Sequence, residues 1–320
     1  MRVLFFSIVL LTVFISCEKE EIPIPPHTIG DVFFQQVELG QDYRYQVFYD
    51  LGTNSVVSQN IKTDWDLGFE SSSQGFHIKL NSSTYSSLSY FENAIFEDTF
   101  TIDNLFWSWD NPNGSLDSTA FGDYRALERI YIIDRGFDLN GNQRGYKKMV
   151  IDTVTDSYYL IRYADLDNSD LYTFQVNKTP DVNFTSFSFS DNNILNIEPS
   201  KLDWDLLFSQ YTHLYSDTSV PSYVVTGVLS NNNVNISIDT INAFEDISYN
   251  MINSSSFDNN QNTIGFNWKE YDLTSGQYTI YSNFNYIIRD HESKYYKLRF
   301  LDFYNDLGVK GYPKFEIQEL

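Results

Sequence analysis

The segment KTDWDLGF at residues 62–69 returns 139 residues later as KLDWDLLF at residues 201–208. Each copy follows an aromatic segment with strand-like alternation and an Asn-rich turn, at residues 45–60 and 184–200. Alternation with a period of two residues is typical of half-buried β-strands. The repeat therefore predicts that one strand-rich pattern is used twice along the chain.

Other landmarks follow in the same order in both halves. YYLIRYAD at residues 158–165 resembles YYKLRFLD at residues 295–302, which is an offset of 137 residues. Trp109 pairs with Trp268, and residues 131–133 pair with residues 286–288, at unequal spacings that loop insertions explain. We expect a tandem duplication with its junction near residues 178–180. An alternative is that both halves share one sandwich, each supplying a sheet.

Composition supports an all-β fold. Aromatic residues make up 17% of the 320 residues, and Asn, Ser, Asp and Gly gather between the apolar runs. Aromatic side chains suit pleated strands, and the small polar residues suit tight turns. We therefore predict two tandem antiparallel β-sandwich-like domains, at residues 31–180 and 181–320.

The first 30 residues are predicted to lie outside these domains. Residues 1–16 have the positive start and short apolar run of a signal peptide. Cys17 is the only cysteine, so no internal disulfide can form, and its place resembles the lipobox of bacterial lipoproteins. Residues 17–30 then form a lipidated tether with a proline-rich spacer, and the acidic cluster after Cys17 resembles a signal for export to the outer face.

Charge and motifs narrow the classes of function. The net charge of −22 repels phosphate backbones and makes nucleic acid an unfavourable partner. The sequence contains no phosphate-binding loop, nucleophile elbow, His-Glu-x-x-His motif or zinc cage. These observations favour a binding protein over an enzyme, with no catalytic residues and no metal-ion site.

The repeated Asp-Trp-Asp segments have a structural interpretation. Trp65 and Trp204 are expected to be buried core anchors. The aspartates on either side of each tryptophan are expected at solvated strand ends or turns, and not in a catalytic carboxylate pair.

The repeated motif and the ending YKLRFLDFYN at residues 296–305, with GVKGYPKFE at residues 308–316, resemble the HmuY family. That family consists of all-β surface lipoproteins of Bacteroidetes, and its best-known members capture haem and pass it to a TonB-dependent receptor. The resemblance implies haem as a ligand, a lipid anchor at Cys17, a place on the exterior of the outer membrane and such a receptor as partner. The alternative is a carbohydrate- or protein-binding outer-membrane module without haem.

A six-coordinate haem needs two imidazole or thioether ligands that face each other across the ring. The founding type of the family uses two axial histidines, and some relatives use methionine. His213 is the first candidate because it follows the second repeat motif and lies between Tyr211 and Tyr215. His77, Met251 and His291 are the candidates for the opposite side, and His291, which is expected at a hairpin tip, would have to fold over the cleft.

Overall fold

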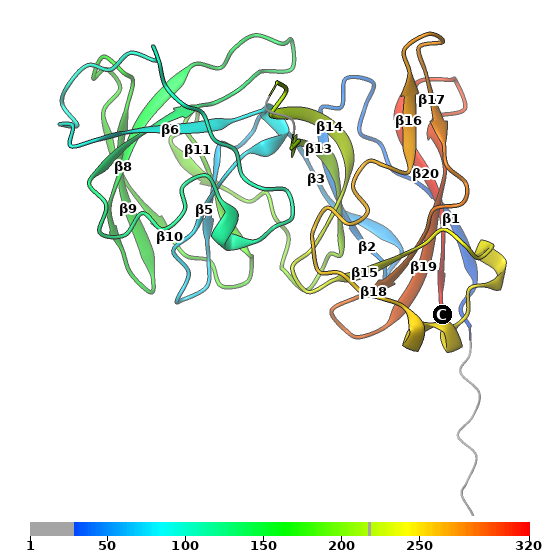
Figure 1. The fold of residues 1–320 in the computed structure, drawn as a ribbon. Helices are drawn as coiled ribbons and strands as arrows, with labels where there is room; N and C mark the ends of the chain where they lie inside the picture. The colour runs from blue at the N-terminus through cyan, green and yellow to red at the C-terminus, as the bar shows by residue number, and fades with distance from the viewer. Residues whose placement is uncertain (1–28, 217–218) are drawn as a thin grey trace, which may run out of the picture.

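A computed structural model describes residues 29–216 and 219–320. They form an all-β protein of twenty strands with a few short 3-10 helices (Figure 1), which confirms the predicted fold class. Every strand pair is antiparallel, and within the described residues no helix is long and apolar enough to cross a membrane. The predicted signal peptide, Cys17 and the predicted tether up to residue 28 lie outside the described residues.

The strands form two lobes. The first lobe contains β4 (Leu67–Glu70), β5 (Ile78–Leu80), β6 (Ser87–Glu92), β7 (Arg129–Asp134), β8 (Tyr146–Val154), β9 (Tyr158–Ala164), β10 (Tyr172–Asn177), β11 (Phe184–Ser188) and β12 (Asn193–Leu195), with the 3-10 helices η1 (Ser82–Thr84) and η2 (Leu116–Ser118). The second lobe contains β1 (Val32–Gln36), β2 (Tyr45–Asp50), β3 (Ser55–Ile61), β13 (Leu206–Leu214), β14 (Ser222–Ser230), β15 (Asn235–Asp239), β16 (Lys269–Asp272), β17 (Gln277–Ile280), β18 (Asn285–Arg289), β19 (Tyr295–Tyr304) and β20 (Lys310–Glu319), with η3 (Phe244–Asp246) and η4 (Tyr249–Ser254).

Both lobes have the same strand order. Each lobe has a four-stranded sheet and a five-stranded sheet. In the first lobe their orders are β12-β11-β4-β5 and β10-β9-β8-β7-β6. In the second lobe they are β3-β2-β13-β14 and β1-β20-β19-β18-β15. Each lobe encloses its own aromatic core, because the alternating strands turn one face inward. A separate small cluster, containing Phe48, Trp65, Ile197 and Trp204, joins the lobes.

The strand pairing crosses the expected boundary between residues 180 and 181. Strand β2 pairs with β13, across that boundary, and β3 pairs in turn with β2. In return, β11 pairs with β4 in the first lobe, and β12 pairs with β11. The division into cores therefore places residues 67–195 in one lobe and the chain on both sides of them in the other. The origin of the repeat by duplication stays a prediction.

Candidate functional site

The predicted ligand residues lie in three different places. His77 immediately precedes β5 in the first lobe, where its Nδ1 lies 2.6 Å from Oε2 of Glu70 and its ring packs on Phe76. His213 lies on β13 of the second lobe. Met251 lies on η4, and Figure 1 shows these short helices beside the C-terminus, far from the β16–β17 hairpin. The structure does not bring these three side chains together.

His213 lies among aromatic rings. Its ring is 4.7 Å from that of Tyr215 and 5.0 Å from that of Phe266, measured between centroids, and Tyr223 stands opposite it on β14. Burial lowers the pKa of His213, and its Nδ1 is buried without a hydrogen-bond partner. The imidazole is therefore neutral at pH 7 and retains an unused polar nitrogen.

A tyrosine groove runs beside His213, between β14 and the β16–β17 hairpin. Its cavity volume is about 660 Å³. Six tyrosines line this tyrosine groove: Tyr43, Tyr215, Tyr223, Tyr271, Tyr278 and Tyr281. Tyr223 is 62% exposed and Tyr271 is 45% exposed, so the rings form an accessible aromatic face. Clustered exposed aromatic rings mark binding surfaces more often than isolated ones do.

Two lysines, Lys269 and Lys310, line the tyrosine groove. Lys310 lies over the Tyr43 ring, with its Nζ 5.0 Å from the centroid. Lys269 is buried, donates a hydrogen bond to the carbonyl of Thr226 and lies 4.4 Å from the Trp268 ring centroid. Burial lowers the pKa of Lys269 to about 7. Lys269 is therefore only about half protonated at pH 7, and Lys310 is the cationic side chain of the tyrosine groove that suits a carboxylate.

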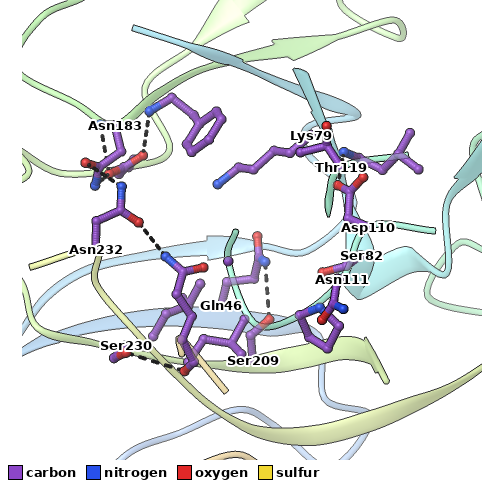
Figure 2. A pocket seen from close by; sticks show the side chains of 18 of the residues that line it. Gln46, Lys79, Ser82, Asp110, Asn111, Thr119, Asn183, Ser209, Ser230 and Asn232 are labelled. Atoms are coloured by element: carbon purple, nitrogen blue, oxygen red, sulfur yellow. Dashed lines mark hydrogen bonds between the residues drawn. The ribbon is translucent and has the colours of Figure 1, made fainter. Parts of the chain in front are cut away.

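A second hollow lies between the lobes (Figure 2), and we call it the inter-lobe cavity. Its walls come from β2, β5, β13 and β14 and from the loops around residues 110–119, 183 and 261. Both repeated tryptophans line it, and both are buried, which confirms their expected place. Figure 2 shows Lys79 extending into the cavity, with Asn183 and Asn232 across from it.

The aspartates that follow the tryptophans are not solvated, so the expectation for them was wrong. Asp66 is 1% exposed and accepts hydrogen bonds from Arg135 and from the backbone N–H of Phe189, with Arg144 also 3.0 Å away. Asp205 is fully buried and accepts one hydrogen bond, from the backbone N–H of Leu51. The position is buried because each Asp lies at the start of a central strand, not at an outer turn.

His291 lies in the turn between β18 and β19, as expected for a hairpin tip. Its Nδ1 is 3.6 Å from Oδ1 of Asp205. This contact turns the histidine toward the buried aspartate and away from the tyrosine groove. Within residues 29–216 and 219–320, no group of three or more metal-binding side chains occurs.

Two asparagines that hydrogen-bond to the repeated motif could not be identified from the sequence. Nδ2 of Asn81 donates to the carbonyls of Lys62 and Trp65 at 2.7 and 2.8 Å. Nδ2 of Asn231 donates to those of Lys201 and Trp204 at 2.9 and 2.8 Å. The asparagines follow their tryptophans by 16 and 27 residues, and this unequal spacing hides the correspondence.

The sequence matches the model of one known protein family. The family model described as HmuY protein matches residues 42–317, which is most of the chain and spans both lobes. No curated protein matches the sequence.

Two crystal structures provide distant likenesses. Apo PinO from Porphyromonas gingivitis is 7% identical, with a TM-score of 0.31 and coverage of 91% of this chain and 97% of its own. The apo HmuY analog of Tannerella forsythia is 8% identical, with a TM-score of 0.27 and coverage of 92% and 98%. Scores this low carry no argument about the site, so the family rests on the sequence match.

Proposed function

This chain belongs to the HmuY protein family, and from that premise we propose that it captures a flat aromatic ligand at the cell surface. Haem is the ligand that the family resemblance implies. The family is one of binding proteins, and the proposed role is capture and hand-over without catalysis. A TonB-dependent outer-membrane receptor is the proposed partner.

The tyrosine groove is the observation that carries this proposal. Its exposed phenol rings provide a face on which a porphyrin can stack, and aromatic pairs of this kind contribute about 0.5–1.5 kcal/mol each beyond area burial. Lys310 stands at its edge and could pair with a propionate. His213 is the one candidate ligand that packs against its lining rings.

The described residues fit the porphyrin face but not an iron held from both sides. His77 is in the other lobe and is hydrogen-bonded to Glu70, and Met251 lies on η4 beside the C-terminus. Neither is positioned opposite His213. We therefore propose that stacking holds the ring, with His213 as the one imidazole among residues 29–216 and 219–320 that packs on the rings of the tyrosine groove.

Removing groove rings tests this proposal. The double replacement of Tyr223 and Tyr271 with alanine is expected to weaken haem binding at least tenfold, because both exposed rings lose their contact with the porphyrin. Titration with ferric haem, followed by the Soret band, measures the affinity. Both residues are largely exposed, so the unfolding temperature should change little.

The matched control is Phe106→Ala, which removes an aromatic ring that is 91% exposed on the first lobe. It is expected to leave haem affinity unchanged. His213→Ala should alter the ferric spectrum while much of the affinity remains. Equal losses in the Phe106 and groove variants would contradict the proposed location.

Anchoring at Cys17 is part of the same proposal. The mature protein is expected to begin at Cys17 with a lipidated cysteine, because a sole cysteine follows an apolar signal-like run. Mass spectrometry of the mature N-terminus checks this, and Cys17→Ala should leave an unlipidated precursor. An unmodified terminus elsewhere, for example at Pro23, would show that the protein is not anchored in this way.

A further inference from the structure

Three of the side chains that line the inter-lobe cavity carry a polar atom that has no hydrogen-bond partner among the described residues. Nζ of Lys79 makes no hydrogen bond or ion pair with any described residue. It lies 4.1 Å from the Phe184 ring centroid and 5.7 Å from that of Trp65. Nε1 of Trp204 and Oγ1 of Thr119 are buried without a hydrogen bond. Buried polar groups are nearly always satisfied, so three unpartnered groups that line one cavity point to a missing ligand.

The two tryptophans show how one of these groups loses its partner. Nε1 of Trp65 donates to Oε1 of Gln46 on β2, at 2.8 Å. Leu67 pairs with Phe187 and Leu206 pairs with Tyr49, so the matching strand position to Gln46 is Phe184 on β11. Phenylalanine cannot accept a hydrogen bond, so the Trp204 N–H is left without a partner.

Lys79 is a second position at which the two lobes differ in residue type. It pairs with Gly68, whereas Leu229 pairs with Leu207 at the equivalent place in the second lobe. The same strand position is therefore occupied by Leu229 in the second lobe and by Lys79 in the first. Burial lowers the pKa of Lys79, which means that its charge is costly where it lies. An unpaired lysine kept at such a cost is typical of a binding site.

The surrounding charges disfavour an anion. Asp110 and Glu198 also line the cavity, and both act electrostatically on Lys79. Asp110 accepts backbone hydrogen bonds from Leu80 and Ala120, and Glu198 accepts them from Asn183 and Phe184. A carboxylate or phosphate ligand would meet these two carboxylates as well as the lysine. A neutral ligand with hydroxyl groups avoids that repulsion.

The remaining walls suit a neutral polyhydroxylated ligand. Gln261 donates to Asn232, which donates to Asn183, so a chain of amides crosses one side of the cavity. Trp65, Trp204 and Phe184 provide apolar rings. Sites of this kind combine aromatic walls with a few placed polar groups. The cavity volume is about 120 Å³, against about 10–15 Å³ for one water by the same measure, which is enough room for a single sugar ring.

We propose that the inter-lobe cavity binds one pyranose ring of a neutral sugar, with its hydroxyls hydrogen-bonded to Lys79, Trp204 and Thr119. The C–H faces of the sugar lie against the indole and phenyl rings. This site is separate from the tyrosine groove and does not depend on haem binding.

Calorimetric titration of the purified chain with the methyl pyranosides of glucose, galactose and mannose tests the proposal. At least one of them should bind, and Lys79→Met should weaken that binding tenfold or more, because a hydrogen bond to a charged group is lost. The same replacement should raise the unfolding temperature of the free protein, since it removes an unpaired buried charge. A purely structural lysine would not give this opposite pair of effects.

Trp204→Phe is the second variant, because it removes the N–H and keeps an aromatic ring. It should weaken the sugar about tenfold. Lys310→Met, in the tyrosine groove, is the matched control and should leave pyranoside affinity unchanged. Lys79→Met should in turn leave the Soret titration with haem unchanged, which separates this site from the proposed function.

Three outcomes would overturn the inference. The first is that no pyranoside binds at millimolar concentrations, in which case ordered water alone satisfies the three groups. The second is that only a methyl glucuronide binds, which would identify the ligand as an anion. The third is that Lys79→Met binds the pyranoside as well as the unaltered protein does.

Discussion

A fragment containing residues 62–199 is expected to fold on its own, whereas a fragment from Phe184 to Leu320 is expected to stay unfolded. The first fragment contains all nine strands of its lobe. Its core is complete too, because every buried residue of that core lies between Leu67 and Phe189. Circular dichroism and thermal unfolding of the purified fragments measure the difference.

The second fragment lacks part of its core. Val37, Leu39, Val47, Tyr49 and Leu51 are five of the twenty buried residues of the second lobe's main core cluster, and the fragment lacks all five. The Tyr49 ring packs on Phe208 and Phe315, at centroid distances of 6.1 and 5.4 Å. Losing a single such ring costs about 3–5 kcal/mol, and a domain has only about 5–15 kcal/mol in total. Cooperative unfolding of the 184–320 fragment would show that the crossed pairing is not required.

Asp66→Asn is expected to lower the free energy of unfolding by about 3–5 kcal/mol, the usual cost of breaking a buried ion pair. Its carboxylate faces two guanidinium groups and a backbone N–H, at distances between 2.8 and 3.1 Å. An asparagine would turn N–H donors toward other donors and leave Arg135 and Arg144 unpaired. Chemical denaturation at pH 7 measures the loss.

Asp205→Asn is the matched control, because Asp205 occupies the equivalent position with no arginine beside it. The asparagine oxygen can still accept from the backbone N–H of Leu51. Burial raises the pKa of Asp205 from 3.8 to about 6. The folded state therefore holds the proton more tightly, and stability falls as pH rises from about 4 to about 6.

The asparagine variant should lose that pH dependence. It should match the unaltered protein near pH 4 and be more stable above pH 6, by at most about 3 kcal/mol. A large destabilisation by Asp205→Asn at pH 7 would contradict this account of the two aspartates.

The sequence predicted the strands and the buried tryptophans because both depend on local patterns. It could not predict that β2 and β3 belong with β13, since pairing between short aromatic strands depends on the whole fold. The match of residues 158–165 with residues 295–302 shows that similar local sequences need not occupy equivalent strands. These segments form β9 and β19, but the strand in the place of β19 is β8.

Buried lysines reveal the correct correspondence. Lys148 on β8 donates to the carbonyls of Phe96 and Asp98, and Lys297 on β19 donates to those of Phe244 and Ile247. Their cross-strand partners are Ile132 and Ile287, in the paired segments that the sequence did identify. The loop between β7 and β8 is longer than that between β18 and β19, so the spacing from the isoleucine to the lysine differs between the two halves of the sequence.

The candidate site was predictable in part. His213 was singled out for its tyrosine neighbours, and Tyr215 does pack against it. The other groove rings come from four separate segments of the chain, and no local pattern joins them. The polar groups of the inter-lobe cavity depend on the crossed pairing, which no spacing in the sequence reveals. Whether His213, His77 or Met251 binds haem stays a prediction.

The central claim is that ring stacking in the tyrosine groove holds the ligand without coordination from both sides. The most direct test compares the affinity of the purified chain for ferric haem with its affinity for metal-free protoporphyrin IX. Because the iron contributes little when stacking dominates, the two dissociation constants are expected to agree within about tenfold. Tight haem binding with a six-coordinate low-spin spectrum, and no binding of the metal-free ring, would contradict the claim.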